Sequence, residues 1–264
     1  MKKRLLIANR SEIAIRIIRS AHKLGMLAVV FQSDREPDAL YLKYADEIIP
    51  ARDAGNEKPI FLDADRIVKL AVEHNIDLLH PGYGFLSENP DFAMLCVSNG
   101  INFIGPSPEL IRDMGLKTVA KSMAIKLGLP LVPGSDGPVN DAKAAKEFSD
   151  KIGYPVILKA SAGGGGRGMR IVEKQDTIER HFKSASDEAL AAFGNGDMFI
   201  EKYLQNPKHL EFQILGDKHG NVVHLGEREC SLQRKHQKIL EEAPSASVSP
   251  AMRKEMGDEN RDQS

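Results

Sequence analysis

Short apolar segments of strand length alternate with helical patterns through the first half of this 264-residue chain. In the first helical pattern, apolar residues recur at a spacing that places them on one helix face. Ser11 is positioned to cap this helix, and Gly25 to end it. Strands that alternate with helices build a parallel, doubly wound sheet, so the chain begins with an α/β domain. The predicted strands are residues 5–8, 27–31, 47–49, 77–80 and 102–104, and the later helices are residues 64–74 and 89–99.

The turn after the first predicted strand excludes one large class of enzymes. A sheet that binds a dinucleotide carries Gly-x-Gly-x-x-Gly at this turn. Here the turn reads Ala8-Asn9-Arg10-Ser11-Glu12. The sheet is Rossmann-like without the NAD fingerprint, and this excludes a dehydrogenase.

The second half of the chain has a different order of elements. Glycine and proline crowd residues 128–138, which indicates a linker. A helix at 141–152 and strands at 155–160, 169–172 and 198–202 predict a small α+β lid. Longer strands at 209–215 and 221–229 open a third lobe. Residues 257–264 are polar apart from one glycine, so they predict disorder and leave that lobe unfinished.

Composition narrows the function classes further. Lys plus Arg (36) nearly balance Asp plus Glu (37), so the net charge of the chain does not favour binding to nucleic acid or to a membrane surface. The apolar runs are too short for a membrane span or a signal peptide. Cys96 and Cys230 lie far apart without zinc-like spacing. A reduced cytoplasmic compartment is the simplest prediction, and an organelle matrix is also compatible.

A glycine-rich segment follows the strand that ends near Lys159 and runs to Arg170. Glycine has no Cβ, so the backbone of such a segment can approach a polyphosphate and direct its N–H groups at the oxygens. The spacing is not that of a Walker A loop. It favours a glycine-rich hairpin that covers phosphates, and the alternative is a flexible loop without a ligand.

Four other segments have both a functional and a structural interpretation. Residues 201–204 can read the edge of an adenine, although a solvated charge pair explains them as well. Alternation in 209–213 places His209, Glu211 and Gln213 on one strand face, and a solvent-exposed face of an edge strand would show the same pattern. Residues 227–238 are rich in cations and suit an anionic substrate or a surface turn. Residues 80–89 follow a strand, where ligand loops and structural turns both occur.

The successive motifs of biotin carboxylases are resembled, in order, by residues 8–14, 80–89, 159–170, 201–204 and 227–238, and residues 241–244 continue the resemblance. The family implies an ATP-grasp fold. Its boundaries would give a Rossmann-like pre-ATP-grasp domain at 1–116 and a linker at 117–134. A lid would occupy 135–203, the start of the catalytic lobe 204–257, and a disordered tail 258–264.

The resemblance also implies the site residues. Lys238 matches a catalytic lysine that contacts bicarbonate, and Tyr83 lies in a loop on the biotin side. Leu116 replaces the usual acidic residue before Lys117, with little expected effect. The ATP contacts would be Lys117, Lys159, Gly163, Gly164, Gly165, Gly166, Met169, Glu201, Lys202, Leu204, His209, Gln233 and His236.

The implied chemistry is carboxylation of biotin on a carrier protein or domain, with ATP and bicarbonate, through carboxyphosphate. A carboxyltransferase would then serve an acyl-CoA carboxylase and fatty acid biosynthesis. The family's Mg²⁺ ligands lie downstream of Gly257, so we expect none within this chain, and an inactive fragment of a complete form that is often a homodimer. The alternatives are another bicarbonate-activating ATP-grasp ligase, of the carbamoyl-phosphate-synthase type, or a non-catalytic nucleotide-binding fragment.

Overall fold

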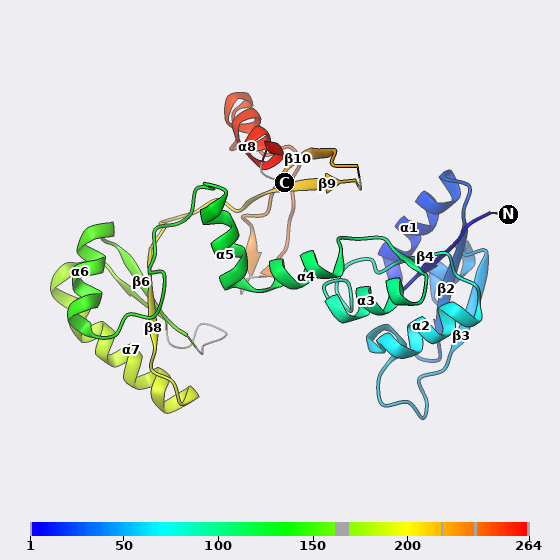
Figure 1. Cartoon of the computed structure of the whole chain (residues 1–264), viewed down its shortest axis with the longest axis horizontal. Helices are drawn as coiled ribbons and strands as arrows, with labels where there is room; N and C mark the ends of the chain where they lie inside the picture. Colours follow the sequence, from blue (N-terminus) through cyan, green and yellow to red (C-terminus); the bar gives the residue numbers. More distant parts are fainter. Residues whose placement is uncertain (1, 162–168, 218, 235–236, 263–264) are drawn as a thin grey trace. The chain divides into compact units, whose positions relative to one another are not determined.

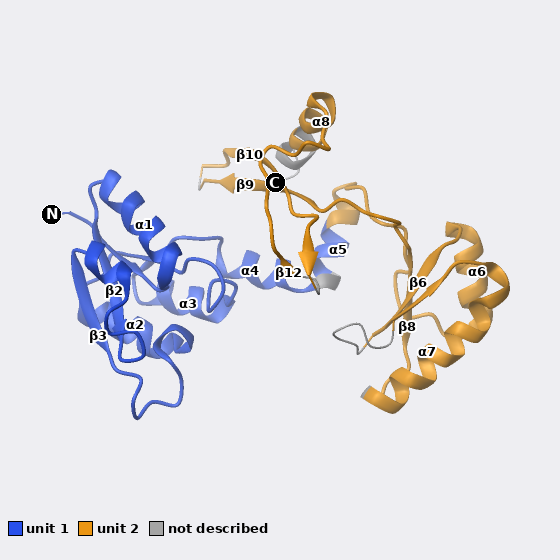
Figure 2. Cartoon of the chain, turned by 180° about the vertical axis from the view of Figure 1, so that it is seen from behind, with its two compact units in different colours: residues 1–123 blue, residues 124–264 orange. Residues whose placement is uncertain are grey.

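The structure is a computed structural model that describes residues 2–161, 169–217, 219–234 and 237–262. The chain divides into two compact units, residues Met1–Met123 and Ala124–Ser264 (Figures 1 and 2). In the part of the chain that the structure describes, no helix combines the length and the apolar character that a bilayer span needs.

A five-stranded parallel sheet in the order β3-β2-β1-β4-β5 forms the centre of the first unit. Leu6 of the central strand pairs with Val29 on one side and Leu79 on the other, which fixes the register. The predicted α/β domain is confirmed. The strands are β1 (Arg4–Ile7), β2 (Leu27–Ser33), β3 (Glu47–Ala51), β4 (Leu78–His80) and β5 (Asn102–Phe103).

Helices pack on both faces of this sheet because the strand side chains alternate in direction. Leu6 and Phe31 belong to a core with residues of α2 and α3, whereas Ile7 and Val30 belong to a second core with residues of α1. The helices of this unit are α1 (Ser11–Lys23), α2 (Ala64–Glu73), α3 (Pro90–Ser98) and α4 (Pro108–Gly115), with 3₁₀ turns η1 (Leu40–Tyr44) and η2 (Ile60–Leu62); α5 (Lys117–Lys126) crosses the boundary between the two units.

The start of α1 corrects one prediction. The N-cap is Arg10, and Ser11 is the first residue of the helix, with a left-handed φ of +57°. The Arg10 side chain makes no capping hydrogen bond. The helix therefore begins one residue earlier than we predicted. In the preceding turn, the side-chain oxygen of Asn9 accepts a hydrogen bond from the Arg10 amide at 2.9 Å. Gly25, with φ of +70°, lies just past the helix end as predicted.

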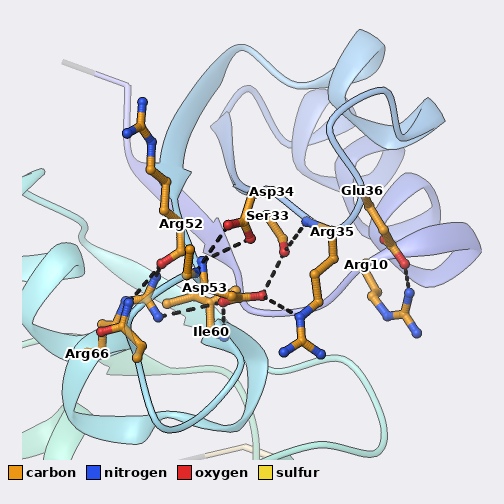
Figure 3. A network of polar contacts seen from close by, with 11 residues as sticks. Arg10, Ser33, Asp34, Arg35, Glu36, Arg52, Asp53, Ile60 and Arg66 are labelled. Atoms are coloured by element: carbon orange, nitrogen blue, oxygen red, sulfur yellow. Dashed lines mark hydrogen bonds and ion pairs between the residues drawn. The ribbon is translucent and has the colours of Figure 1, made fainter.

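A buried carboxylate ties together the carboxyl ends of β2 and β3 (Figure 3). Asp53 accepts hydrogen bonds from the Ser33 hydroxyl and the Ile60 amide, each at 2.8 Å. The guanidinium groups of Arg35 and Arg66 lie 3.4 and 3.6 Å from its oxygens. Because its acceptor sites are filled in this way, Asp53 holds the 53–60 loop against the sheet.

The second unit contains a three-stranded antiparallel sheet in the order β7-β6-β8, the predicted lid strands. Buried residues of the sheet, such as Leu158 and Ile200, share a core with Ala145 of α6 and Phe182 of α7. Asp141 caps α6 as its position suggests, accepting from the Ala144 amide at 2.8 Å. The elements are α6 (Ala142–Ile152), β6 (Val156–Ala160), β7 (Met169–Val172), η3 (Gln175–Thr177), α7 (Ile178–Phe193) and β8 (Met198–Lys202).

The rest of the second unit is built on an antiparallel pair, β9 (Leu210–Gly216) and β10 (Val222–Glu229), with a bulge between His224 and Glu227. The short strands β11 (Gln233–Arg234) and β12 (Gln237–Lys238) pair with each other. Large apolar side chains of this region remain exposed, namely Leu215, Val223, Leu225, Leu232, Ile239 and Leu240.

The structure differs from the expected segment boundaries in two places. Helix α5 begins at residue 117, where we expected a linker to start. Helix α8 (Pro250–Asp262) extends through most of the tail for which we expected disorder. The tail is helical because the helix begins upstream, where the Ser249 hydroxyl accepts from the Met252 amide at 3.2 Å and Arg253 binds the buried Glu227.

Candidate functional site

Lys159 and Glu201 form an ion pair across the neighbouring strands β6 and β8. Each side chain is 39% exposed, so both remain accessible to a ligand. Lys159, a predicted ATP contact, is therefore neutralised by Glu201 in the ligand-free chain. A bound polyphosphate would compete with Glu201 for it.

The end of β8 carries the other predicted lid contacts. The Lys202 ammonium donates to the carbonyls of Gly153 and Tyr154 at 3.0 and 2.8 Å, so this side chain fixes the turn before β6. Leu204 is exposed and Met169, the first residue of β7, is half-buried. The side chain of Lys202 thus has a structural role, and its backbone N–H donates to the Pro133 carbonyl at 2.7 Å.

His209 and Gln233 meet beside β9. The Gln233 amide nitrogen lies 2.8 Å from His209 Nδ1 and 3.0 Å from the Cys230 carbonyl. With that amide donating, Nδ1 is the acceptor and the ring proton is on Nε2. His209 Nε2 lies 4.0 Å from a carboxylate oxygen of Glu211. Two predicted ATP contacts are therefore adjacent, and one of them, His209, lies beside Glu211.

Glu211 lies between two cations. The Lys238 ammonium donates to it at 2.6 Å, and the Arg228 guanidinium lies 2.7 Å from its other oxygen. Glu241 lies 4.0 Å from Lys238 and 3.9 Å from Arg228. The strand register explains the Arg228 contact, because Arg228 faces Glu211 across β9 and β10.

This cluster determines the charge state of Lys238. The hydrogen bond to Glu211 raises the pKa of the Lys238 ammonium, and the same bond lowers the pKa of the Glu211 carboxyl. Lys238 is therefore a cation near neutral pH and cannot act as a base there. A cation at this position is compatible with the predicted bicarbonate contact.

One group within the described residues has the donor spacing of a metal site. Ligand atoms of Glu211, Cys230 and Glu241 lie within 4.8 Å of one another. Lys238 and Arg228 already pair with these carboxylates, and burial raises the pKa of the Cys230 thiol. A divalent cation would meet two positive charges and a protonated thiol, so these residues do not fit magnesium.

Tyr83 lies in the first unit, in the loop after β4, and its side chain is 60% exposed. Its hydroxyl donates to Glu12 in the first turn of α1. The sheet order changes direction between β1 and β4, and the loops after these two strands meet at that switch point. The structure therefore places Tyr83 where open α/β sheets bind ligands.

Several predicted contacts lie outside the described residues: Gly163, Gly164, Gly165, Gly166, His236 and the side chain of Lys117. The glycine content of residues 163–168 also predicts the most mobile loop of the lid, and that prediction concerns residues outside the described part of the chain. Glu211 and Arg228 were not among the predicted site residues. The alternation that placed His209 and Glu211 on one strand face was the signal that could have identified Glu211.

Two family models together match nearly the whole chain. "Biotin carboxylase, N-terminal domain" matches residues 1–111. "Carbamoyl-phosphate synthase L chain, ATP binding domain" matches residues 117–261. Biotin carboxylase 2, chloroplastic, of Populus trichocarpa is 49% identical over 97% of this chain. The chain belongs to the biotin carboxylase family.

Other relatives extend the comparison. The 2-oxoglutarate carboxylase small subunit of Hydrogenobacter thermophilus is 49% identical over 97% of the chain, and human mitochondrial pyruvate carboxylase is 47% identical over 95%. A solved biotin carboxylase domain of a thermophilic 2-oxoglutarate carboxylase bound to bicarbonate superposes with a TM-score of 0.90 at 46% identity, covering 98% of this chain and 56% of that one. The ADP-bound form without magnesium gives 0.86 at 48%, covering 98% and 57%.

The chain spans about half the length of the first two of these relatives, 48% of the poplar protein and 54% of the bacterial subunit, and 21% of the human pyruvate carboxylase. The poplar relative and the two solved domains are named as biotin carboxylases, and the other two relatives as carboxylases. The carbamoyl-phosphate-synthase alternative is therefore not favoured, although one matching model carries that name.

Proposed function

We propose that the protein containing this chain carboxylates biotin on a carrier protein or domain, using ATP and bicarbonate. The supporting observation is the cluster of Lys238, Glu211 and Arg228 beside the His209–Gln233 pair. It combines an anion-holding ammonium with two predicted nucleotide contacts where residues of the β11–β12 pair contact residues of β9 and its N-terminal end. A solved relative contains Mg-ADP and bicarbonate in its domain, which supports the same ligands here.

In the proposed reaction, a bicarbonate oxygen attacks the γ-phosphorus of ATP and ADP leaves. The resulting carboxyphosphate releases CO2 and phosphate, and a ureido nitrogen of biotin gains the carboxyl group and loses its proton. Lys238 would hold the bicarbonate anion, and Lys159 the phosphates once Glu201 is displaced. Such positioning and charge neutralisation is how phosphoryl-transfer enzymes lower the barrier. The Mg²⁺ of this reaction needs ligands other than Glu211, Cys230 and Glu241.

We propose the remaining assignments on the same basis. The pre-ATP-grasp domain would be residues 1–116, the lid 135–203 and the catalytic lobe from 204. A carboxyltransferase would use the carboxylated biotin, with an acyl-CoA or a keto-acid as acceptor, and fatty acid biosynthesis is one such use. Both cysteines are free and buried, which fits a reducing compartment, either cytoplasm or an organelle matrix. A relative has been solved as a domain dimer, which supports a homodimer.

Biotin-dependent ADP release tests the function. The protein that extends this chain to the length of its relatives should release ADP only when biotin and bicarbonate are both present. Lys238→Gln should abolish this release, whereas Lys183→Gln, a change on the exposed surface of α7, should not. Equal rates in the two variants would refute the role given to Lys238. The 264-residue chain alone should bind ADP without biotin-dependent turnover.

A further inference from the structure

The turn after β1 clamps the loop that carries Tyr83. Asn9 is 3% exposed, and its side-chain amide donates to the carbonyls of Pro81 and Tyr83 at 2.8 and 2.9 Å. Its oxygen accepts from the Arg10 amide. All of the hydrogen-bonding groups of this buried side chain are thus used to hold two neighbouring loops together.

Gly82 shows how closely the two loops approach. With φ of +69°, a Cβ at this residue would lie 2.4 Å from the Asn9 side-chain nitrogen. The Gly82 amide donates to His80 Nδ1 at 3.0 Å, and burial lowers the pKa of that imidazole, which keeps it a neutral acceptor. Only glycine fits here, so the loop is held in one conformation on the side of Asn9.

The side chain of Tyr83 is held separately from its backbone. Its hydroxyl donates to the Glu12 carboxylate, and this bond is the main reason why the pKa of Glu12 is lowered and that of Tyr83 is raised. Because the hydroxyl hydrogen is committed to Glu12, the oxygen presents only lone pairs to a ligand. Tyr83 therefore faces its ligand as a hydrogen-bond acceptor.

We propose that Asn9 and Glu12 are positioning residues for Tyr83, Asn9 through its backbone and Glu12 through its hydroxyl, so that Tyr83 accepts a hydrogen bond from an N–H group of the biotin ureido ring. The ligand in this statement rests on the proposed function. The positioning itself rests on the contacts of residues 9–12 with residues 81–83. The ureido ring carries N–H donors, which an acceptor-only hydroxyl complements.

The first test measures Tyr83 directly. Tyrosine labelled with ¹³C at Cζ reports the titration of each phenol, and Tyr83→Phe identifies the Tyr83 resonance. Glu12→Gln should move the Tyr83 titration to lower pH. Asp38→Asn, which removes a carboxylate from the same surface hollow as Glu12, should leave it in place. An unchanged Tyr83 titration in Glu12→Gln would overturn the role of Glu12.

The second test concerns Asn9. Asn9→Asp keeps the shape but replaces the amide donor that faces two carbonyl oxygens with a carboxylate oxygen, which can only accept. Hydrogen exchange of the amides at 82–85 should therefore become about tenfold faster or more. Asn75→Asp, at an exposed residue between α2 and β4, is the matched control. Exchange at the control rate would refute the clamp. If Asn9→Asp does not fold, the exposed Glu12 variant still decides the proposal.

The third test concerns the ligand. In the catalytically complete protein, Glu12→Gln should raise KM for free biotin about tenfold and leave KM for ATP unchanged. An equal rise in both KM values would assign Glu12 a general structural role. If no variant or parent shows biotin-dependent turnover, the proposed function fails. The tyrosine titration and the exchange rates would still establish or refute the positioning.

Discussion

Replacing Arg253 by methionine should release helix α8 from the β9–β10 pair. Arg253 Nε lies 2.8 Å from both carboxylate oxygens of Glu227, and a terminal nitrogen lies 2.6 Å from one of them. The Glu227 side chain is only 1% exposed. Removing one member of a buried pair costs about 3–5 kcal/mol, because the other charge is left without a partner. The Arg253 side chain is 31% exposed, so we reduce this cost to about 2–3 kcal/mol.

Hydrogen exchange measures this local cost without requiring two-state unfolding of the whole chain. A cost of about 2–3 kcal/mol corresponds to exchange about 30- to 160-fold faster, at 1.36 kcal/mol per factor of ten. The effect should appear in the amides of α8 and of residues 245–249. Lys254→Met, at the exposed neighbouring residue, is the control. A change below about threefold in Arg253→Met would refute the reasoning.

The same network predicts a pH dependence. The Arg253 hydrogen bonds lower the pKa of Glu227 from an ordinary 4.5 to about 2. The hydroxyl of Ser245, followed by Lys208, lowers the pKa of Glu229 to about 2. A carboxyl with a depressed folded-state pKa stabilises the fold above its ordinary pKa and loses that contribution as pH falls through the folded value. Protection of α8 should therefore fall between pH 4.5 and 2, and less so in Arg253→Met.

Three further predictions concern other sites. Ser11→Gly should stabilise the first unit by about 0.5–1 kcal/mol, seen as a higher melting temperature, because Ser11 holds a left-handed φ; a lower value contradicts this. Cys96, whose thiol pKa burial raises to about 12, should resist alkylation at pH 8 in the folded chain and react on unfolding. Lys238→Met should raise the pKa of Glu211, measured by carboxyl ¹³C titration; an unchanged value would contradict their pairing.

The sequence by itself determined the elements and their class. Apolar periodicity predicted the five parallel strands and the lid strands, because strand and helix periods follow from local backbone geometry. It also placed Glu211 beside His209 on one strand face. The order of motifs indicated the family, which the comparisons with known proteins then established.

Tertiary structure decided which polar groups meet. Asn9 reaches residues 81 and 83 only because β1 and β4 are neighbours in the sheet, and Glu211 binds Lys238 across 27 residues of chain. Helix α8 forms where local composition predicted disorder, since Arg253 is bound by a carboxylate from β10. Such contacts depend on how distant segments pack, and no local pattern encodes the distance between them.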